Sequence, residues 1–110
     1  EAFQADMDND DEMAALNFIY GNITIETILN NCATIATDTT ENWADTETHT
    51  LEVYVDDDGA VTYKIDGDAP TATAAFSFDS GEVVVPFFYF LHDADLAGAV
   101  VLKAWEVGYQ

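Results

Sequence analysis

The sequence predicts an all-β fold, an antiparallel β-sandwich or jelly roll, and three observations lead to this prediction. Apolar and polar residues alternate strictly over residues 51–55 and 61–65, as they do in strands with one buried face. Turn residues such as Asp58-Gly59 recur at short intervals, while helical periodicity is weak along the whole chain. Roughly eight short strands separated by close turns fit a two-layer β fold.

The central segment predicts a β-hairpin whose turn lies at Asp58-Gly59. Both residue types tolerate the positive φ angles that tight hairpin turns require. The two strands share one apolar face, made of Leu51, Val53, Val55, Val61, Tyr63 and Ile65. We expect this face to lie in the core.

A second hairpin is predicted ahead of the central one. Residues 15–20 are short and rich in aromatic and branched side chains, and the dipeptide Gly21-Asn22 marks a turn. Residues 23–28 then resume the alternation of a strand.

The regions around this hairpin are more polar. Residues 1–14 form an acidic, loop-rich segment with a short strand expected at residues 2–4. Residues 34–45 are dominated by Thr, Asp and Asn around Trp43, which predicts the end of a strand leading into a polar loop.

The last third of the chain predicts three further strands. Residues 74–78 alternate, with Phe76 and Phe78 on one face. Residues 83–91 are almost continuously apolar, as expected for a strand buried on both faces, and Pro86 within them implies a bulge or an edge position. Residues 99–109 are expected to form the closing strand, whose two faces carry Val101, Lys103, Trp105 and Val107 on one side and Val100, Leu102, Ala104 and Glu106 on the other.

The charge is the most unusual feature of the composition. The 110 residues, which we expect to form a single domain, carry 22 acidic side chains against 2 lysines and no arginine, a formal net charge of -20. A nucleic-acid partner is excluded because phosphate binding needs clustered basic residues, and an anionic membrane surface is disfavoured for the same reason. Such self-repulsion predicts either a saline, halophilic habitat or a solubilising coat on a crowded assembly.

Cysteine usage and chain ends add little chemistry. Cys32 is the only cysteine, so no intrachain disulfide can form, and we expect it to be a small buried apolar residue. The longest apolar run is too short to span a bilayer. The chain begins at Glu1 without a methionine, which suggests a processed product or a piece of a longer polypeptide.

One candidate metal site lies in the acidic N-terminal segment. Asp6, Asp8 and Asp10 have the alternate spacing of calcium-loop carboxylates. An EF-hand is excluded, since Asp11 stands at the position of the required glycine and Asn17 at that of the bidentate glutamate. A solvated loop is the simpler interpretation, and apart from calcium at this loop we expect no cofactor.

Catalytic patterns are weak, and we expect the protein not to be an enzyme. The two histidines each lie beside acidic residues, so His92 with Asp93 and Asp95, or His49, could belong to a metal or acid–base cluster. Glycosidase chemistry would need two carboxylates facing one groove. The glutamates that could supply them are Glu26, Glu52, Glu82 and Glu106, and nothing in the sequence places two of them together.

Aromatic residues give the strongest indication of an interaction surface. Alternating aromatics in a sandwich usually belong to the core, yet rings occupy both faces of residues 87–90. One of these faces needs a second layer, another subunit or a sugar ring to cover it. The candidate carbohydrate or interface residues are Trp43, Phe88, Phe90 and Trp105.

Three segments, residues 51–67, 85–90 and 101–108, resemble the C-terminal half of concanavalin A-like (laminin G-like) jelly rolls, most of all those in virion proteins of tailed phages. The resemblance implies a jelly roll in a virion, and the chain could be the C-terminal part of a larger concanavalin A-like domain, because members are usually longer. The calcium and sugar ligands of lectin-type members have no matching positions here.

These observations predict a non-enzymatic virion structural protein, a capsid decoration or a tail or fibre component. It would contact identical or neighbouring virion subunits and form a homo-oligomer. The alternative is a lectin-like carbohydrate-binding module of a secreted or cell-surface protein, in which Trp43 or Trp105 stacks on a glycan. A glycoside hydrolase fragment is a third, weaker possibility.

Overall fold

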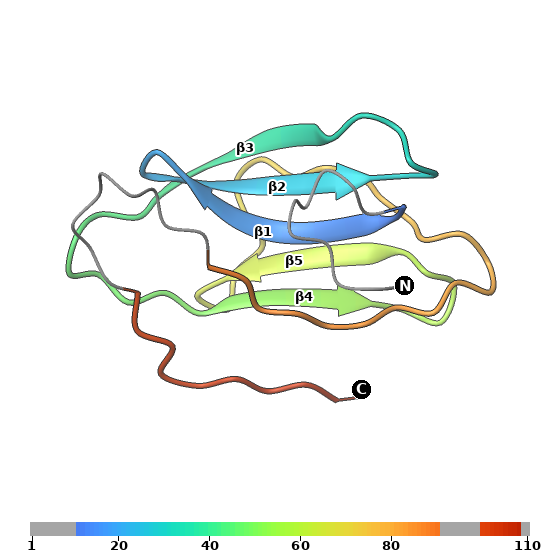
Figure 1. Ribbon diagram of the computed structural model, residues 1–110. Helices are drawn as coiled ribbons and strands as arrows, with labels where there is room; N and C mark the ends of the chain where they lie inside the picture. The colour runs from blue at the N-terminus through green and yellow to red at the C-terminus, as the bar shows by residue number, and fades with distance from the viewer. Residues whose placement is uncertain (1–10, 91–99, 109–110) are drawn as a thin grey trace.

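The computed structural model describes residues 11–90 and 100–108 of the chain, and within them the fold is all-β (Figure 1). A three-stranded antiparallel sheet has the order β1-β2-β3, and a two-stranded antiparallel sheet consists of β4 and β5. The strands are β1 (Met13–Ile19), β2 (Asn22–Ile28), β3 (Ile35–Asn42), β4 (Leu51–Val55) and β5 (Val61–Ile65). The prediction of an all-β fold with antiparallel sheets is confirmed, and this part of the chain contains no helix that could cross a membrane.

The first hairpin forms as predicted, with its turn one residue earlier. Ile19 pairs with Asn22, so the turn residues are Tyr20 and Gly21, with φ angles of 50° and 84°. Positive φ at both central positions matches the right-handed twist of the flanking strands. The first strand begins at Met13, so the predicted acidic segment does not extend to residue 14.

The strand β3 is longer and more regular than the polar composition of residues 34–45 predicts. Its eight residues pair with β2, with a register shift between Asn22 and Thr24. The side chain of Thr39 in β3 is fully buried, and its Oγ1 donates a hydrogen bond of 2.6 Å to the carbonyl oxygen of Ile23 in β2. Because threonine is β-branched and can satisfy its hydroxyl locally, a polar sequence still forms a strand here.

The second hairpin forms with the predicted shared face, but its turn is longer than the predicted Asp58-Gly59 pair, because the amide of Asp56 donates to the Ala60 carbonyl and only Gly59 of that pair has a positive φ. Leu51 faces Ile65, Val53 faces Tyr63 and Val55 faces Val61, so the six apolar residues share one face. Only the β5 half of this face is buried throughout, since Val53 and Val55 remain 42% exposed. The expectation that the whole face lies in the core is therefore correct for β5 and wrong for part of β4.

The core lies between the two sheets. Ile25 of β2 packs with Val61 and Tyr63 of β5, and partly buried apolar residues surround them: Ala14, Leu16, Ala74, Phe76 and Phe78. Two antiparallel sheets joined by apolar side chains are consistent with a β-sandwich.

Residues 74–78 run beside β5 without forming a regular strand. The amide of Val61 donates to the Phe76 carbonyl, the amide of Phe78 donates to the Gly59 carbonyl, and a single bridge joins Ala60 and Ser77. The predicted strand is thus reduced to one bridge with two flanking hydrogen bonds. Phe76 and Phe78 pack edge-on, with ring centroids 5.1 Å apart.

The two predicted C-terminal strands are not formed. Residues 83–90 and 100–108 belong to no strand, and Val83 is 87% exposed instead of buried on both faces. Residues 91, 99 and 109 of these predictions, and the strand expected at residues 2–4, lie outside the described ranges. A strand needs a neighbouring strand edge to pair with as well as a suitable sequence. Neither segment pairs with another strand in the described part of the chain.

Candidate functional site

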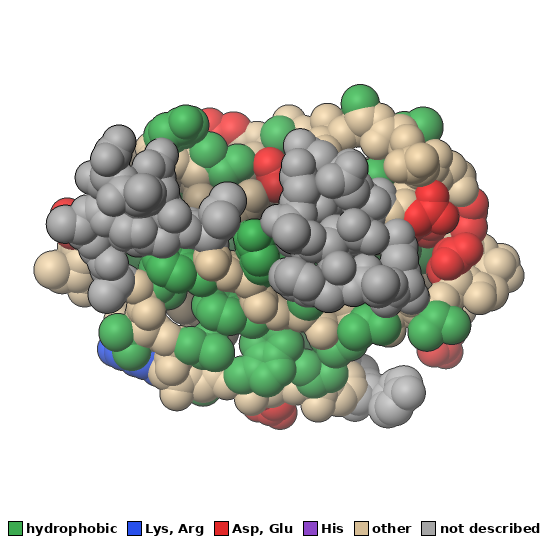
Figure 2. All heavy atoms as spheres, viewed as in Figure 1, with side chains coloured by type: hydrophobic (Ala, Val, Ile, Leu, Met, Phe, Trp, Pro, Cys, Tyr) green, Lys and Arg blue, Asp and Glu red, His purple; other side chains and the backbone are tan. Residues whose placement is uncertain are grey.

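The main surface feature is a concentration of exposed apolar side chains in two C-terminal segments. Of the 17 large apolar residues exposed in the described part of the chain, 11 lie in residues 83–90 and 100–107. They are Val83, Val84, Val85, Phe87, Phe88, Phe90, Val100, Val101, Leu102, Trp105 and Val107. Figure 2 shows hydrophobic side chains gathered along the lower side of the molecule, where these segments run in Figure 1. We call these two segments the C-terminal apolar surface.

Two of the four predicted aromatic candidates meet on this surface. Phe88 and Trp105 are 17 positions apart in the sequence, yet their ring centroids lie 6.2 Å apart at an interplanar angle of 65°. Phe88 is 50% exposed, Trp105 is 53% exposed, and Phe90 is 50% exposed nearby in the sequence. The pair therefore offers aromatic area that a partner could bury.

Trp43 belongs to a different cluster. Its half-buried ring packs edge-on against Phe18, with centroids 5.5 Å apart, and against His49, with centroids 5.1 Å apart. Its indole N–H donates to the carbonyl oxygen of Glu47 at 3.2 Å. Because the ring contacts Phe18 and His49 and the N–H contacts Glu47, Trp43 holds the connection between β3 and β4 in place.

His49 is held between two carboxylates at the end of this connection. Nδ1 lies 2.6 Å from Oδ2 of Asp66, and Nε2 lies 3.1 Å from Oε2 of Glu47. The other oxygen of Asp66 accepts the amide N–H of Thr50 at 2.8 Å. We call these three side chains the His49 cluster. The sequence singles out His49 but not Asp66, although the hairpin register, extended by one position, places Thr50 opposite Asp66.

Electrostatics favour the charged form of every member of the His49 cluster. Hydrogen bonds to Asp66 and then to Glu47 raise the pKa of His49. The amide of Thr50, followed by the imidazole, lowers the pKa of Asp66, and the amide of Ala44, followed by the imidazole, lowers that of Glu47. In its charged form, the imidazole donates from both nitrogens and has no lone pair for a metal or for proton abstraction. This geometry suits a structural role.

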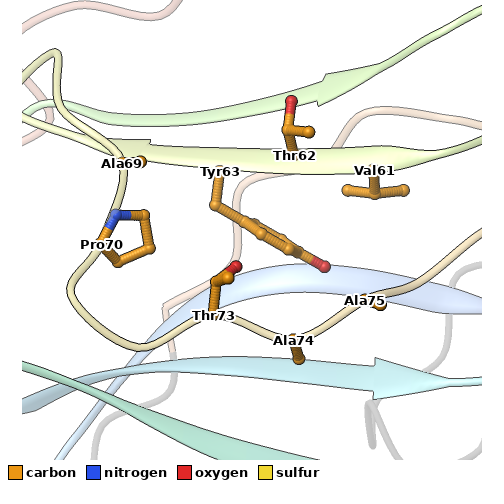
Figure 3. Close-up of a pocket in the computed structure, with 8 residues that line it drawn as sticks. All are labelled: Val61, Thr62, Tyr63, Ala69, Pro70, Thr73, Ala74 and Ala75. Carbon is orange, nitrogen blue, oxygen red and sulfur yellow. The ribbon is translucent and has the colours of Figure 1, made fainter.

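Two open apolar pockets lie beside the core. The first, of about 320 Å³, is lined by Val61, Thr62, Tyr63, Ala69, Pro70, Thr73, Ala74 and Ala75 (Figure 3). Burial raises the pKa of Tyr63 to about 12, and its hydroxyl is buried with no hydrogen-bond partner among the described residues. Because that oxygen is out of reach of solvent, it is equally out of reach of a ligand in the pocket.

The second pocket, of about 400 Å³, corrects the prediction for Cys32. It is lined by Thr27, Leu29, Asn30, Cys32, Ala33, Ile35, Ala75, Phe76 and Ser77. Cys32 is exposed, because Asn30 and Asn31 adopt positive φ angles of 51° and 55° and turn the chain away from the core. No acidic side chain of the described residues lines either pocket.

The remaining candidates are not brought together. Within residues 11–90 and 100–108, no group of three or more His, Cys, Asp or Glu side chains could hold a metal ion. Glu26 on β2 accepts a hydrogen bond from Asn17, and Glu52 on β4 accepts one from Tyr54. The candidates Asp6, Asp8, Asp10, His92, Asp93 and Asp95 lie outside the described ranges.

Comparison of the chain with protein families, with curated proteins and with solved structures finds no match. Function must therefore follow from the residues themselves. The C-terminal apolar surface stands out among these features, because the exposure of large apolar side chains to water is energetically unfavourable.

Proposed function

We propose that this protein is a non-enzymatic structural subunit of a virion, a capsid decoration or a tail or fibre component, which acts through contacts with identical or neighbouring subunits. The C-terminal apolar surface is the observation that carries the proposal. Contiguous exposed apolar side chains mark interaction sites in soluble proteins. Burying Phe88 and Trp105 against a neighbour would remove large aromatic areas from water.

The charge distribution supports the same role. The chain carries a formal net charge of -20, yet residues 83–91 and 96–105 contain no acidic residue. Two copies repel each other across most of their surface, and this repulsion weakens where carboxylates are missing. Contacts between copies are thus directed to the C-terminal apolar surface.

The finer fold assignment belongs to the same proposal. We propose that the two sheets form a jelly roll of the concanavalin A-like kind, and that the chain is the C-terminal part of a larger domain of that type. The packed antiparallel sheets are compatible with this architecture. The resemblance of residues 51–67, 85–90 and 101–108 to virion modules of tailed phages supports it.

Density-gradient purification of the native source, followed by mass spectrometry, tests this function. We expect the chain to co-sediment with particles at many copies for each particle. Recovery only in the soluble fraction would overturn the virion assignment.

A lectin-like module remains a second candidate, favoured by the exposed Phe88–Trp105 pair. Aromatic faces of this kind can stack on sugar rings. Saccharide titration monitored by tryptophan fluorescence should then give a saturable shift that Trp105→Ala abolishes and Trp43→Phe preserves. The absence of a shift across neutral, acidic and amino sugars argues against carbohydrate binding.

A further inference from the structure

We propose that residues 100–108 pair with the same residues of a second copy to form a two-stranded antiparallel ribbon, with a two-fold axis at Ala104. This inference rests on the proposed function and names the partner and geometry of part of its surface. The ribbon would join two subunits symmetrically, since a two-fold interface uses the same patch on both copies.

The first support is the state of the backbone. In the part of the chain that the structure describes, residues 100–108 make no backbone hydrogen bond, and all nine are exposed. Figure 1 draws this segment as an extended trace outside both sheets. Its sequence includes three valines and Trp105, residue types that favour strands. An extended segment of this kind can satisfy its amides and carbonyls on another chain.

The second support is self-complementarity about Ala104. An antiparallel pair centred there places Val101 opposite Val107 and Lys103 opposite Trp105, each twice by symmetry. Apolar pairs and cation–π pairs both stabilise directly opposed positions. Leu102 faces Glu106, so no two like charges are opposed.

Other centres give poorer pairing. A two-fold axis at Lys103 would oppose the two lysines, which is unfavourable. An axis at Trp105 would oppose the two tryptophans, but it would place Lys103 opposite Val107 and lose both symmetry-related cation–π pairs. The sequence therefore selects Ala104 among these neighbouring registers.

The third support is electrostatic and identifies a second copy as the partner. Residues 96–105 hold no carboxylate, and Lys103 is one of only 2 basic residues in the chain. Two molecules of charge -20 repel each other least at segments without carboxylates, and salt should strengthen the contact by screening repulsion elsewhere. Forming the cation–π pair replaces the exposed 3.0 Å hydrogen bond from Lys103 Nζ to Thr48 Oγ1 with a contact to the opposed tryptophan, while backbone pairing leaves the contact of Trp105 with Phe88 in place.

Symmetric cross-linking tests the register. On a Cys32→Ser background, which removes the exposed native thiol, Ala104→Cys places two thiols directly opposite each other. The control Leu102→Cys lies on the same strand face, but its two copies are offset along the ribbon. Under mild oxidation of the full chain, we expect the Ala104→Cys dimer to form at least about tenfold faster, because disulfides require close Cβ atoms. Sedimentation velocity over a range of salt concentrations gives the association of the Cys32→Ser protein alone.

The outcomes separate the ribbon from the proposed function. Equal cross-linking of Ala104→Cys and Leu102→Cys overturns the ribbon, and so does a monomer at every salt concentration. If the chain nevertheless co-sediments with particles, the structural role stands with another contact geometry. Selective cross-linking of a protein that is absent from particles supports the ribbon and removes the virion assignment.

Discussion

The strand β5 and residues 101–107 carry the same kind of sequence and adopt different states. In β5, Val61, Tyr63 and Ile65 are at most 7% exposed and face the other sheet. In the C-terminal segment, Val101, Trp105 and Val107 also lie on one face of the extended chain, with Lys103 among them, and all three are more than half exposed. Alternation fixes which residues share a face, whereas pairing and burial depend on an available neighbouring edge.

The largest contrast between these regions should come from truncating one apolar side chain in each. Ile25 is fully buried between the sheets, so Ile25→Ala should lower the free energy of unfolding by about 2–5 kcal/mol through lost burial and a residual cavity. The matched change Val101→Ala removes an exposed side chain and should cost less than about 0.5 kcal/mol in the isolated chain. Urea unfolding followed by tryptophan fluorescence measures both.

Equal losses for the two variants would mean that residues 100–108 contribute to the folded core. That result would erase the distinction between the two regions. A loss at Val101 only at high protein concentration would instead indicate that association buries it.

Local pattern explains which elements the sequence could predict. The shared apolar face of the β4–β5 hairpin follows from short-range alternation on either side of the turn and was predicted correctly. The strand β3 was predicted only as a strand end, because its stability comes from pairing with β2 and from the buried hydroxyl of Thr39, neither of which polar composition reveals.

The same reasoning explains the predicted site residues. Phe88 and Trp105 were selected as exposed aromatic candidates, but their contact requires the chain to return over 17 positions. The alternating strand faces do not link Asp66 to His49, because Asp66 lies one position beyond the last pair of the hairpin, Leu51 with Ile65. The burial expected for Cys32 failed because the two asparagines before it adopt a turn that sequence alone does not require.

The turn at the tip of the β4–β5 hairpin provides the next largest effect. Gly59 has a φ of 84°, and a Cβ built there would lie 2.7 Å from the carbonyl oxygen of Phe78. Gly59→Ala should therefore destabilise the fold by about 2 kcal/mol, through both backbone strain and this clash. Gly67, with a φ of 90° and open space around its Cβ, is the control, and Gly67→Ala should cost only about 1 kcal/mol.

Thermal unfolding of both glycine variants provides the measurement. A Gly67→Ala variant as unstable as Gly59→Ala would show that backbone conformation alone sets the cost. The close approach of residue 78 to the hairpin tip would then be energetically irrelevant.

Tyr63 offers a smaller effect of opposite sign. Its hydroxyl is buried without a partner among the described residues, so Tyr63→Phe should raise the free energy of unfolding by up to about 1 kcal/mol. Tyr54 is the matched control within the same hairpin, because its hydroxyl donates to Glu52 at 2.9 Å. Tyr54→Phe should be neutral or mildly destabilising. A loss of stability in Tyr63→Phe, measured by urea unfolding, would reveal a hydrogen bond at that oxygen.

The smallest expected effect is the pH dependence of the His49 cluster, which joins the β3–β4 connection to the end of β5. The pKa of His49 is raised in the folded state. Its contribution to stability is therefore complete below the pKa of the unfolded chain, about 6.5, and is lost as pH rises through the pKa of the folded protein. The pKa values of Asp66 and Glu47 are lowered, so their contribution is present above their unfolded values and is lost as pH falls through the folded ones. The cluster should stabilise the fold most between these two limits.

Urea unfolding at about pH 5.5 and about pH 8.5 brackets the imidazole titration. From the lower to the higher pH, the free energy of unfolding of the unmodified chain should fall by up to about 1 kcal/mol more than that of His49→Gln. The difference is small because solvent-exposed carboxylates form weak ion pairs. His92→Gln removes the only other imidazole and should leave the difference unchanged if His49 is its source. Lys103 donates a hydrogen bond to Thr48, next to His49 in the sequence, and so links the connection to residues 100–108. Equal pH profiles for the unmodified chain and His49→Gln would mean that the two carboxylates hold the connection without help from the imidazolium charge.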